Sequence, residues 1–391
     1  MSQKVYVGMS GGVDSSVTAA LLKEQGYEVT GVYMKNWSQD IPGFVCPWKE
    51  DYQDAKRVAV QLGLDFKLYD FETEYRHKVV DYMVREYQAG RTPNPDIMCN
   101  QEVKFKLFLE TALEDGADLI ATGHYARIIR GTKHEARSTT ESQQKGQRAY
   151  SRHSEHSEES QIQMLRSTQH DDKVALQTGL DKNKDQSYFL YRVTEGALRR
   201  SLMPIGDLEK PAVRTLAKKL GLATAEKKDS QGICFVGKVG IKEFLLNELG
   251  PQPHGPIVDQ AGREIGEHDG ALFYTIGQRH GLNVGGGLPY YVTHKDMETN
   301  TVHVTTNLDD AELWTKEMRL QDIHWINPAE RRTPNAVLAA RLRYRGPLIK
   351  CELKNDILTL EEPQHGLAAG QSAVLYDGDH VLGGGIVTKR L

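Results

Sequence analysis

A short glycine-rich stretch near the start of the chain constrains the fold more than any other feature. It reads VYVGMSGGVDSSV, residues 5–17. Residues 5–7 predict a buried strand, residues 8–12 a loop with little side-chain bulk, and residues 15–23 a helix with one apolar face. Glycines allow the backbone to approach an anion closely, and the first turn of the helix offers unpaired N–H groups. The stretch therefore predicts a strand–loop–helix unit able to hold a phosphate or pyrophosphate group.

This loop does not match the two commonest nucleotide-binding motifs. A Walker A loop needs G-x-x-x-x-G-K-[ST], and no lysine occurs between Gly8 and Thr18. The dinucleotide fingerprint G-x-G-x-x-G is absent from the stretch too. A plainer interpretation is an ordinary turn between a strand and a helix, with Asp14 or Ser15 as the N-cap residue. A glycine pair alone favours that interpretation, so the function depends on what else the chain carries.

Strand-like and helix-like stretches alternate from Lys4 to about Arg127. KVYVGM, EVTGVYM, DFKLYDF and DLIATGHY are strand-like, and stretches such as DYQDAKRVAVQLG and EVKFKLFLETALEDG are helix-like. The alternation predicts an α/β domain with a doubly wound parallel sheet, which binds ligands at the carboxyl ends of its strands. The glycine loop lies at one such end, and Met34 and Gly123 lie at others. Those two residues are candidates to surround an adenine or a ribose.

The length of 391 residues predicts two or three domains. We expect the α/β domain over residues 1–238, a small β-rich central domain over 239–304 and a C-terminal β-barrel over 305–391, because strand-like units with short spacing follow residue 239. Residues 131–173 interrupt the first domain with a stretch rich in Ser, Gln, His, Glu and Arg. Such a stretch buries too little apolar surface to offset its ordering entropy, so we expect a disordered surface insertion.

Composition and charge exclude several classes of protein. Charged residues make up 26% and hydrophobic residues 39% of the chain, as in an ordinary globular protein. The net charge of -4 does not indicate nucleic-acid binding by the whole molecule, so any RNA contact must come from local basic patches. No run of about 18 apolar residues and no signal-peptide pattern occurs. We therefore expect a cytoplasmic protein without membrane association, and the lack of heptads favours a monomer.

Cys99 is the first of two cysteines in an informative context. Pro93 and Pro95 precede it in AGRTPNPDIMCN, which predicts a rigid loop leading into a helix from about Glu102. A thiol just ahead of a helix N-terminus has a lowered pKa and favours the nucleophilic thiolate. Asp96 is close enough in sequence to exchange a proton nearby, although in PNPD it also suits an ordinary turn.

Cys234 is the second such cysteine and lies in KKDSQGICFVG, where Lys227 and Lys228 favour a thiolate by charge. The four cysteines are scattered without a C-x-x-C pair, which argues against a zinc site or a disulfide framework. Each of them alone is more often a small buried hydrophobic residue. We keep that interpretation for Cys351 and leave Cys46 unassigned.

Seven motifs occur along the chain in the order that is typical of one enzyme family. They are SGGVDSS, AGRTPNPDIMCN, TGHYAR, KDQSYFL, KKDSQGICF, FYTIGQRHGL and LGGG. The chain thereby resembles the bacterial tRNA-specific 2-thiouridylases of the PP-loop ATP pyrophosphatase superfamily, over nearly its whole length except residues 131–173. The resemblance implies that AMP is transferred from ATP to the C2 carbonyl oxygen of the wobble uridine. Sulfur then replaces that oxygen, which gives 2-thiouridine, AMP and pyrophosphate.

The same resemblance implies roles for the two cysteines and for one carboxylate. Cys234 matches the family residue that carries sulfur as a persulfide, and Cys99 matches the nucleophile that releases it, so the two thiols can finish as a disulfide. Asp96 matches the candidate general base. Such a pair must meet in the fold rather than in the sequence.

Ligand-binding residues are also implied by the resemblance. The residues that match the family's ATP site are Gly8, Met9, Ser10, Gly11, Gly12, Val13, Asp14, Ser15, Met34 and Gly123. Those that match its tRNA contacts are Asn94, Pro95, Asp96, His124, Lys184, Asp185, Gln186, Arg343, Tyr344 and Gln371. Magnesium is expected with the pyrophosphate; its ligands are unknown, and Asp14 is only a guess. The partners implied are the tRNA anticodon loop and a sulfur donor, either a cysteine desulfurase or a relay protein.

Two other functions stay open from the residues. The first is a PP-loop pyrophosphatase or ligase that acts on a small molecule and in which both cysteines are structural. The second is an RNA-binding protein that kept the nucleotide fold without turnover. The segment RLRYRG is the best local basic and aromatic patch in the terminal domain, although without the family resemblance a solvated strand face is the preferred interpretation. We expect residues 131–173 to be a neutral expansion.

Overall fold

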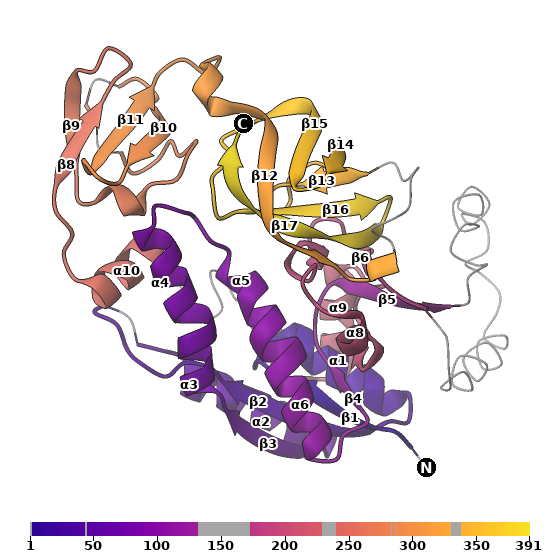
Figure 1. Ribbon diagram of the computed structural model, residues 1–391. Coiled ribbons are helices and arrows are strands. Elements are labelled where there is room, and N and C mark those ends of the chain that lie inside the picture. The colour runs from indigo at the N-terminus through magenta and orange to yellow at the C-terminus, as the bar shows by residue number, and fades with distance from the viewer. Residues whose placement is uncertain are drawn as a thin grey trace.

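A computed structural model describes residues 2–43, 45–131, 173–228, 240–282, 284–285, 287–329 and 338–391. Cys234 and nearly all of the expected insertion lie outside these residues. Figure 1 shows three lobes: an α/β domain at the bottom, a small β domain at the upper left and a β-barrel at the upper right.

The first domain is built on a five-stranded parallel sheet in the order β3-β2-β1-β4-β7. Its strands are β1 (Lys4–Gly8), β2 (Glu28–Lys35), β3 (Asp65–Asp70), β4 (Leu119–Ala121) and β7 (Ser201–Leu202). The first four lie in the stretches that the alternation predicts, so the doubly wound sheet is confirmed. Val5 and Val7 are completely buried at its centre, as the apolar run requires.

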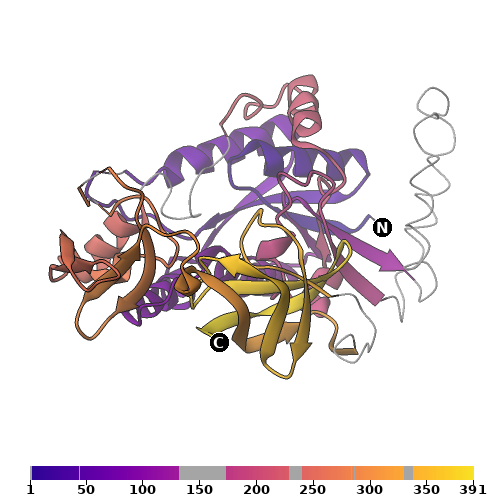
Figure 2. The same ribbon diagram turned by 90° about the horizontal axis from the view of Figure 1, so that it is seen from above.

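Helices cover both faces of this sheet. The apolar side chains of α1 (Val13–Glu24), α2 (Trp48–Leu62) and α9 (Lys210–Lys219) pack with Val5 and Val7 on one face. On the other face lie Tyr6 and Val32, which pack with side chains from a long helical region. That region contains α3 (Glu72–Tyr75), the π-helical η1 (Arg76–Val80), α4 (Asp81–Gln88), α5 (Pro95–Met98), the π-helical η2 (Cys99–Leu107) and α6 (Phe108–Glu114). Figure 2 shows the same layers from above.

The expected start of the helix after Cys99 is wrong. Helical structure begins at Pro95, with Asn94 as the N-cap residue in an extended conformation. Proline is tolerated in the first helical turn because the N–H group that it lacks has no intrahelical partner there. Pro93 and Pro95 therefore mark the entry to a helix rather than an extended loop, and Cys99 belongs to its second turn.

The central domain is a four-stranded sheet preceded by a helix. The sheet has the order β10-β11-β8-β9, with strands β8 (Gly255–Val258), β9 (Glu264–His268), β10 (Tyr291–Asp296) and β11 (Thr301–Thr305). This confirms a β-rich domain, but the strand-like ALFYTIGQ forms the 3-10 turn η6 (Ala271–Phe273) instead. The sequence interpretation also missed α10 (Ile241–Leu249), whose Phe244 and Leu245 are buried in the core of the first domain.

The C-terminal domain is a closed six-stranded barrel. Its strands follow the order β12-β15-β14-β13-β16-β17, and a further β12–β17 pairing closes the ring. They are β12 (Trp314–Trp325), β13 (Ala339–Arg341), β14 (Ile349–Lys354), β15 (Ile357–His365), β16 (Ser372–Asp377) and β17 (His380–Arg390). Closure leaves this sheet without free edges over the barrel, and the predicted barrel is confirmed.

A hairpin of the first domain extends the barrel sheet. The antiparallel strands β5 (Ala126–Gly131) and β6 (Lys173–Thr178) join it through β17, where His380 is paired with Gln177. Gly131 is paired with Lys173 at the far end of this hairpin, so residues 132–172 connect two adjacent strand ends. Shorter elements complete the described structure: η5 (Ser187–Phe189), α8 (Glu195–Arg199) and η7 (Ala311–Leu313).

Candidate active site

The glycine loop occupies the carboxyl end of β1, as predicted. Gly11 has a φ of +74°, which favours glycine, whereas Gly12 has an extended backbone with a φ of -94° and is the N-cap residue of α1. The expectation that Asp14 or Ser15 caps the helix is therefore wrong. The Oγ atom of Ser15 instead accepts a hydrogen bond from the backbone N–H of Ser10 (3.1 Å), which holds the loop against the first turn of α1.

Met34 and Gly123 flank the loop as the sequence interpretation requires. A Cβ atom placed on Gly8 would lie 2.9 Å from Cε of Met34. A Cβ atom on Gly123 would lie 2.8 Å from the backbone nitrogen of Ser15. Because only glycine permits this approach, Gly123 brings the end of β4 directly against the N-terminal turn of α1. The loop backbone, Gly123 and the side chain of Met34 together form a cradle at the carboxyl ends of β1, β2 and β4, which fits a nucleotide with its phosphates at the helix N-terminus.

Asp14 is engaged by two residues that the sequence interpretation missed. Nζ of Lys210 lies 2.8 Å from each of its carboxylate oxygens, and Oη of Tyr125 donates a hydrogen bond of 2.7 Å to Oδ1. Lys210 begins α9, 196 positions after Asp14, and no local motif announces the contact. In the described part of the chain, no group of three His, Cys, Asp or Glu side chains is arranged to hold a metal ion.

Lys227 closes the other side of the loop. Its ammonium group lies 2.7 Å from Asp51 and 2.6 Å from Asp54, both on α2. A Cβ atom on Gly11 would collide with the backbone oxygen of Asp51, so α2 and the loop are in direct contact. Two carboxylates thus balance the Lys227 charge that we expected to favour a thiolate at Cys234.

Cys99 is completely buried at the first residue of η2. Asp96 lies one turn earlier, in the first turn of the same helix. Because Cys99 is inside this helix, the N-terminal effect that we expected to act on its thiol is weaker than for a residue ahead of the helix. Two other cysteines lie in the described part of the chain: burial raises the pKa of Cys351 to about 12, and Sγ of Cys46 donates to the carbonyl oxygen of Trp37 (3.6 Å).

The segment before Pro95 lies where the three domains meet. The backbone N–H of Thr92 donates to the carbonyl oxygen of Ala369 in the barrel (2.8 Å). Its hydroxyl lies 3.1 Å from that of Thr275 in the central domain. Gln371 follows two residues after Ala369, so the structure brings the Asn94–Asp96 segment close to this candidate in the barrel.

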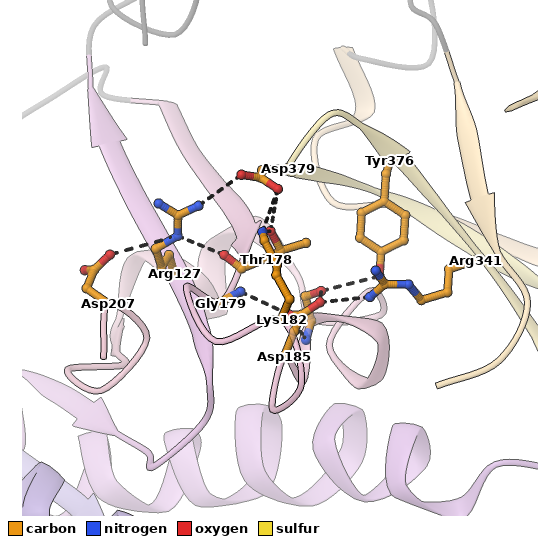
Figure 3. A network of polar contacts seen from close by, with 10 residues as sticks. Arg127, Thr178, Gly179, Lys182, Asp185, Asp207, Arg341, Tyr376 and Asp379 are labelled. Carbon is orange, nitrogen blue, oxygen red and sulfur yellow. Dashed lines mark hydrogen bonds and ion pairs between the residues drawn. The ribbon is translucent and has the colours of Figure 1, made fainter. Parts of the chain in front are cut away.

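The Lys184–Asp185–Gln186 segment has a rigid internal support. Asp185 is buried and accepts hydrogen bonds from the backbone N–H groups of Gly179 and Ser187 (3.0 and 3.1 Å). Nη1 of Arg341 in the barrel lies 2.8 Å from the same carboxylate (Figure 3). Oε1 of Gln186 accepts a hydrogen bond of 3.0 Å from the backbone N–H of Tyr125. The hydrogen bonds and the ion pair of the Asp185 carboxylate are thus made within the protein, where they hold this segment in place.

Aromatic contacts bring further RNA candidates beside the helix that carries Cys99. The rings of Phe189 and Tyr344 are 4.6 Å apart, and Nδ2 of Asn100 donates to the carbonyl oxygen of Phe189 (3.1 Å). Arg343 precedes Tyr344 and donates from Nη2 to the carbonyl oxygen of His365 (3.2 Å). Residues from the first domain and from the barrel thus gather around one helix.

His124 lies on the other flank of that helix. Its ring is 5.7 Å from that of Phe105, and Nδ1 lies 2.8 Å from Oγ1 of Thr122. Burial, helped by the charge of Lys104, lowers the pKa of His124 well below its usual value, so the imidazole is neutral at pH 7. A neutral ring at this position can donate or accept a hydrogen bond but adds no positive charge to the site.

This combination of an α/β nucleotide-binding domain, a small β domain and a closed barrel has counterparts among known families. Residues 3–238 match a family model described as the tRNA methyl transferase HUP domain. Residues 242–306 match a tRNA methyl transferase PRC-barrel domain, and residues 315–387 match an aminomethyltransferase beta-barrel domain. The fold and the glycine loop thus define a member of the HUP class of nucleotide-binding proteins with two appended β domains.

Curated relatives narrow the class to one family. The tRNA-specific 2-thiouridylase MnmA of Neisseria meningitidis is 44% identical over 390 residues, which cover 98% of this chain and 95% of that protein. The proteins of the same name from Streptococcus mutans and Pseudomonas aeruginosa are 41% and 42% identical and cover 98% of this chain, with 95% and 94% of their own lengths matched. The chain belongs to the tRNA-specific 2-thiouridylase family.

Proposed function

We propose that the protein is an ATP-dependent sulfurtransferase that makes 2-thiouridine at the wobble position of tRNA. The observation that carries this proposal is the backbone cradle of Gly8–Ser15 closed by Gly123, in a chain that belongs to the 2-thiouridylase family. The pyrophosphate part of ATP would bind at the first turn of α1, and Met34 would contact the nucleoside part. Magnesium would come with the phosphates.

Activation of the uridine depends on how the two substrates are oriented. The C2 carbonyl oxygen of the base would attack the α-phosphorus of ATP, which forms a bond from that oxygen to AMP and expels pyrophosphate. The loop N–H groups stabilise the charge that builds up on the leaving pyrophosphate. AMP is a far better leaving group than the original oxygen, so C2 then becomes open to sulfur.

Sulfur transfer would use the two cysteines. The thiolate of Cys99 would attack the Cys234 sulfur of the persulfide, so that a Cys99–Cys234 disulfide forms and the outer sulfur leaves as hydrosulfide. Hydrosulfide would add to C2 and expel AMP, which leaves a C2–sulfur double bond and releases a proton. Asp96 is the proposed base for that proton, one helical turn from Cys99. The spent disulfide must be reduced and a sulfur donor must reload Cys234.

RNA binding would use the surface where the first domain meets the barrel. The proposed contacts are Asn94–Asp96, His124, Lys184, Gln186, Arg343, Tyr344 and Gln371. Asp185 would hold its neighbours Lys184 and Gln186 in position through its ion pair with Arg341. A base must leave its stack to reach a buried thiol, so an anticodon loop suits this site better than a duplex.

Among the described residues, no helix is both long and apolar enough to cross a membrane. We place the protein in the cytoplasm as a monomer.

The test is nucleoside mass spectrometry of unmodified tRNA incubated with the protein, ATP, magnesium and a persulfide donor, namely a cysteine desulfurase with cysteine, because free sulfide would bypass Cys99. A 2-thiouridine mass at the anticodon is expected with the wild type and is expected to be lost in Cys99→Ala. Cys351→Ala is the matched control, because this half-buried thiol lies in the barrel, and it should retain activity. AMP and pyrophosphate without a thiolated nucleoside would instead point to a small-molecule substrate.

A further inference from the structure

Lys210 places a buried ammonium group beside the glycine loop. Only 8% of the residue is exposed, although lysine side chains normally reach water. Its Nζ atom lies 2.8 Å from both oxygens of Asp14 and 5.8 Å from the ring centroid of Tyr125. The ammonium is thus held within contact distance of the first turn of α1, where the phosphates of ATP are proposed to bind.

The charges around this ammonium favour an anion. The N-terminus of a helix carries roughly half an elementary positive charge, and Lys210 adds a full one. Asp14 offsets only part of that sum, so the cradle remains positive before the nucleotide arrives. Lys210 would therefore supply to a pyrophosphate group the positive charge that, in a Walker A motif, comes from a lysine within the loop itself.

The backbone of Lys210 is fixed by the segment that carries the proposed RNA contacts. Its N–H donates to Oδ2 of Asp181 (3.0 Å), and Oδ1 of Asp181 accepts from the N–H of Lys184 (3.1 Å). Gln186 in turn accepts from the N–H of Tyr125, whose hydroxyl donates to Asp14. These bonds form a ring that returns to Lys210, so the ammonium is preorganised and needs little ordering when the nucleotide binds.

We infer that Lys210 is the phosphate-binding lysine that the loop sequence lacks. An ammonium group has three donors, so it can contact a phosphate oxygen of the leaving pyrophosphate while it stays close to Asp14. Lys210 forms no covalent bond; it stabilises charge that grows as the α–β phosphate bond breaks. This inference rests on the proposed use of ATP and adds to it a catalytic residue from a distant helix.

The test compares Lys210→Gln with the wild type in steady-state thiolation. We expect kcat/KM for ATP to fall by about thirtyfold or more and the inhibition constant of pyrophosphate to rise by about tenfold. The KM for tRNA and the inhibition constant of AMP should change by less than about twofold, because neither ligand needs a β phosphate contact. Lys219→Gln, an exposed lysine on the same helix, is the matched control and should leave all four constants unchanged.

Two outcomes would overturn the inference. One is a folded Lys210→Gln protein with wild-type constants for ATP and pyrophosphate; the other is equal weakening of ATP, AMP and tRNA, which would indicate a structural role. If Lys210→Gln does not fold, Lys210→Arg takes its place in the test. Arginine keeps the positive charge but places it at a different position, so an unchanged inhibition constant of pyrophosphate would contradict the inference. A wild type that makes no 2-thiouridine refutes the proposed function instead, and ATP-induced thermal stabilisation then still reports whether Lys210 contacts phosphate.

Discussion

Among single residues, Asp185 joins the first domain to the barrel through a fully buried carboxylate. Its side chain is 1% exposed and that of Arg341 is 14% exposed. Removing one partner of a buried pair leaves an uncompensated charge, which costs about 3 kcal/mol or more. We expect Asp185→Ala to lower the free energy of unfolding by that amount in urea titrations and to weaken tRNA binding by releasing the neighbouring residues.

Lys182→Ala is the matched control for that prediction. Lys182 pairs with Asp379 at 2.8 Å, but the side chains are 59% and 51% exposed, so the pair is screened by water (Figure 3). Its loss should cost less than about 1 kcal/mol. If Asp185→Ala were as stable as the wild type yet bound tRNA poorly, the carboxylate would act on RNA directly rather than through the fold.

Single residues also mark the limit of what the sequence could predict. The loop residues Gly8–Ser15 were predictable because their chemistry is local: a strand, glycines and a helix N-terminus in one short stretch. The partners of Asp14 and Asp51 were not, because Lys210 and Lys227 lie 196 and 176 positions away. No periodicity or motif encodes such a contact; it arises only when α9 and the segment after it pack against α1 and α2.

At the scale of elements, the β5–β6 hairpin allows a test of the long insertion. Arg130 is paired with Val174 and Gly131 with Lys173, so the two ends of residues 132–172 are neighbours in a ladder. A two-residue Asn-Gly turn can join such ends, because its twist matches that of the strands. We expect this replacement to leave the fold and the tRNA affinity unchanged within about threefold, measured by thermal unfolding and by filter binding.

The control is the same Asn-Gly replacement combined with Asp379→Ala, which removes the partner of Lys182 and Arg127 at the other end of the hairpin. Both ion pairs are partly exposed, so the combined variant should lose little further stability. A loss of tRNA affinity of more than about tenfold in the simple replacement, with the melting temperature unchanged, would assign the insertion a role in RNA binding.

Elements were predictable where one pattern dominated. The four strands predicted for the first domain, β1 to β4, have β-branched and apolar runs bounded by helices, and they are present where they were expected. The helix at Pro95 and α10 were missed because proline and a change in composition were interpreted as breaks, whereas both helices are stabilised by the core of the first domain. The addition of β5 and β6 to the barrel sheet depends on β17, about 200 residues later, which no local pattern can indicate.

At the scale of the whole molecule, the domains are joined by contacts of different kinds. Arg76 of the first domain pairs with Glu248 of α10 at 2.5 Å, and Thr92 contacts both β domains. The segment before Pro95 therefore changes position if either β domain moves. The proposed RNA contacts come from five stretches of sequence in the first domain and the barrel, so the proposed surface exists only when these two domains are docked.

Buried and half-buried histidines make the stability of the whole molecule sensitive to mild acid. Among the described residues, loss of hydration lowers the pKa of two buried histidines, His124 and His268, and of three half-buried ones, His324, His365 and His380. In the unfolded chain their pKa returns to about 6.5, so below that pH unfolding takes up protons that the folded state does not bind. The free energy of unfolding should therefore fall as pH drops below about 6.5, by up to about 1.4 kcal/mol per pH unit for each such histidine.

Urea unfolding at pH 7.5, 6.5 and 5.5 measures this slope. His268→Gln should flatten it, whereas His77→Gln, whose side chain is 70% exposed, should not. Carboxylates such as Asp115, whose pKa is lowered by hydrogen bonds from Lys67 and Tyr69, act in a separate window because their contribution is lost only below about pH 4. If the free energy of unfolding stayed constant or rose as the pH was lowered from 7.5 to 5.5, these imidazoles would be protonated in the folded protein. His124 would then add a positive charge to the proposed RNA site, where we describe a neutral ring.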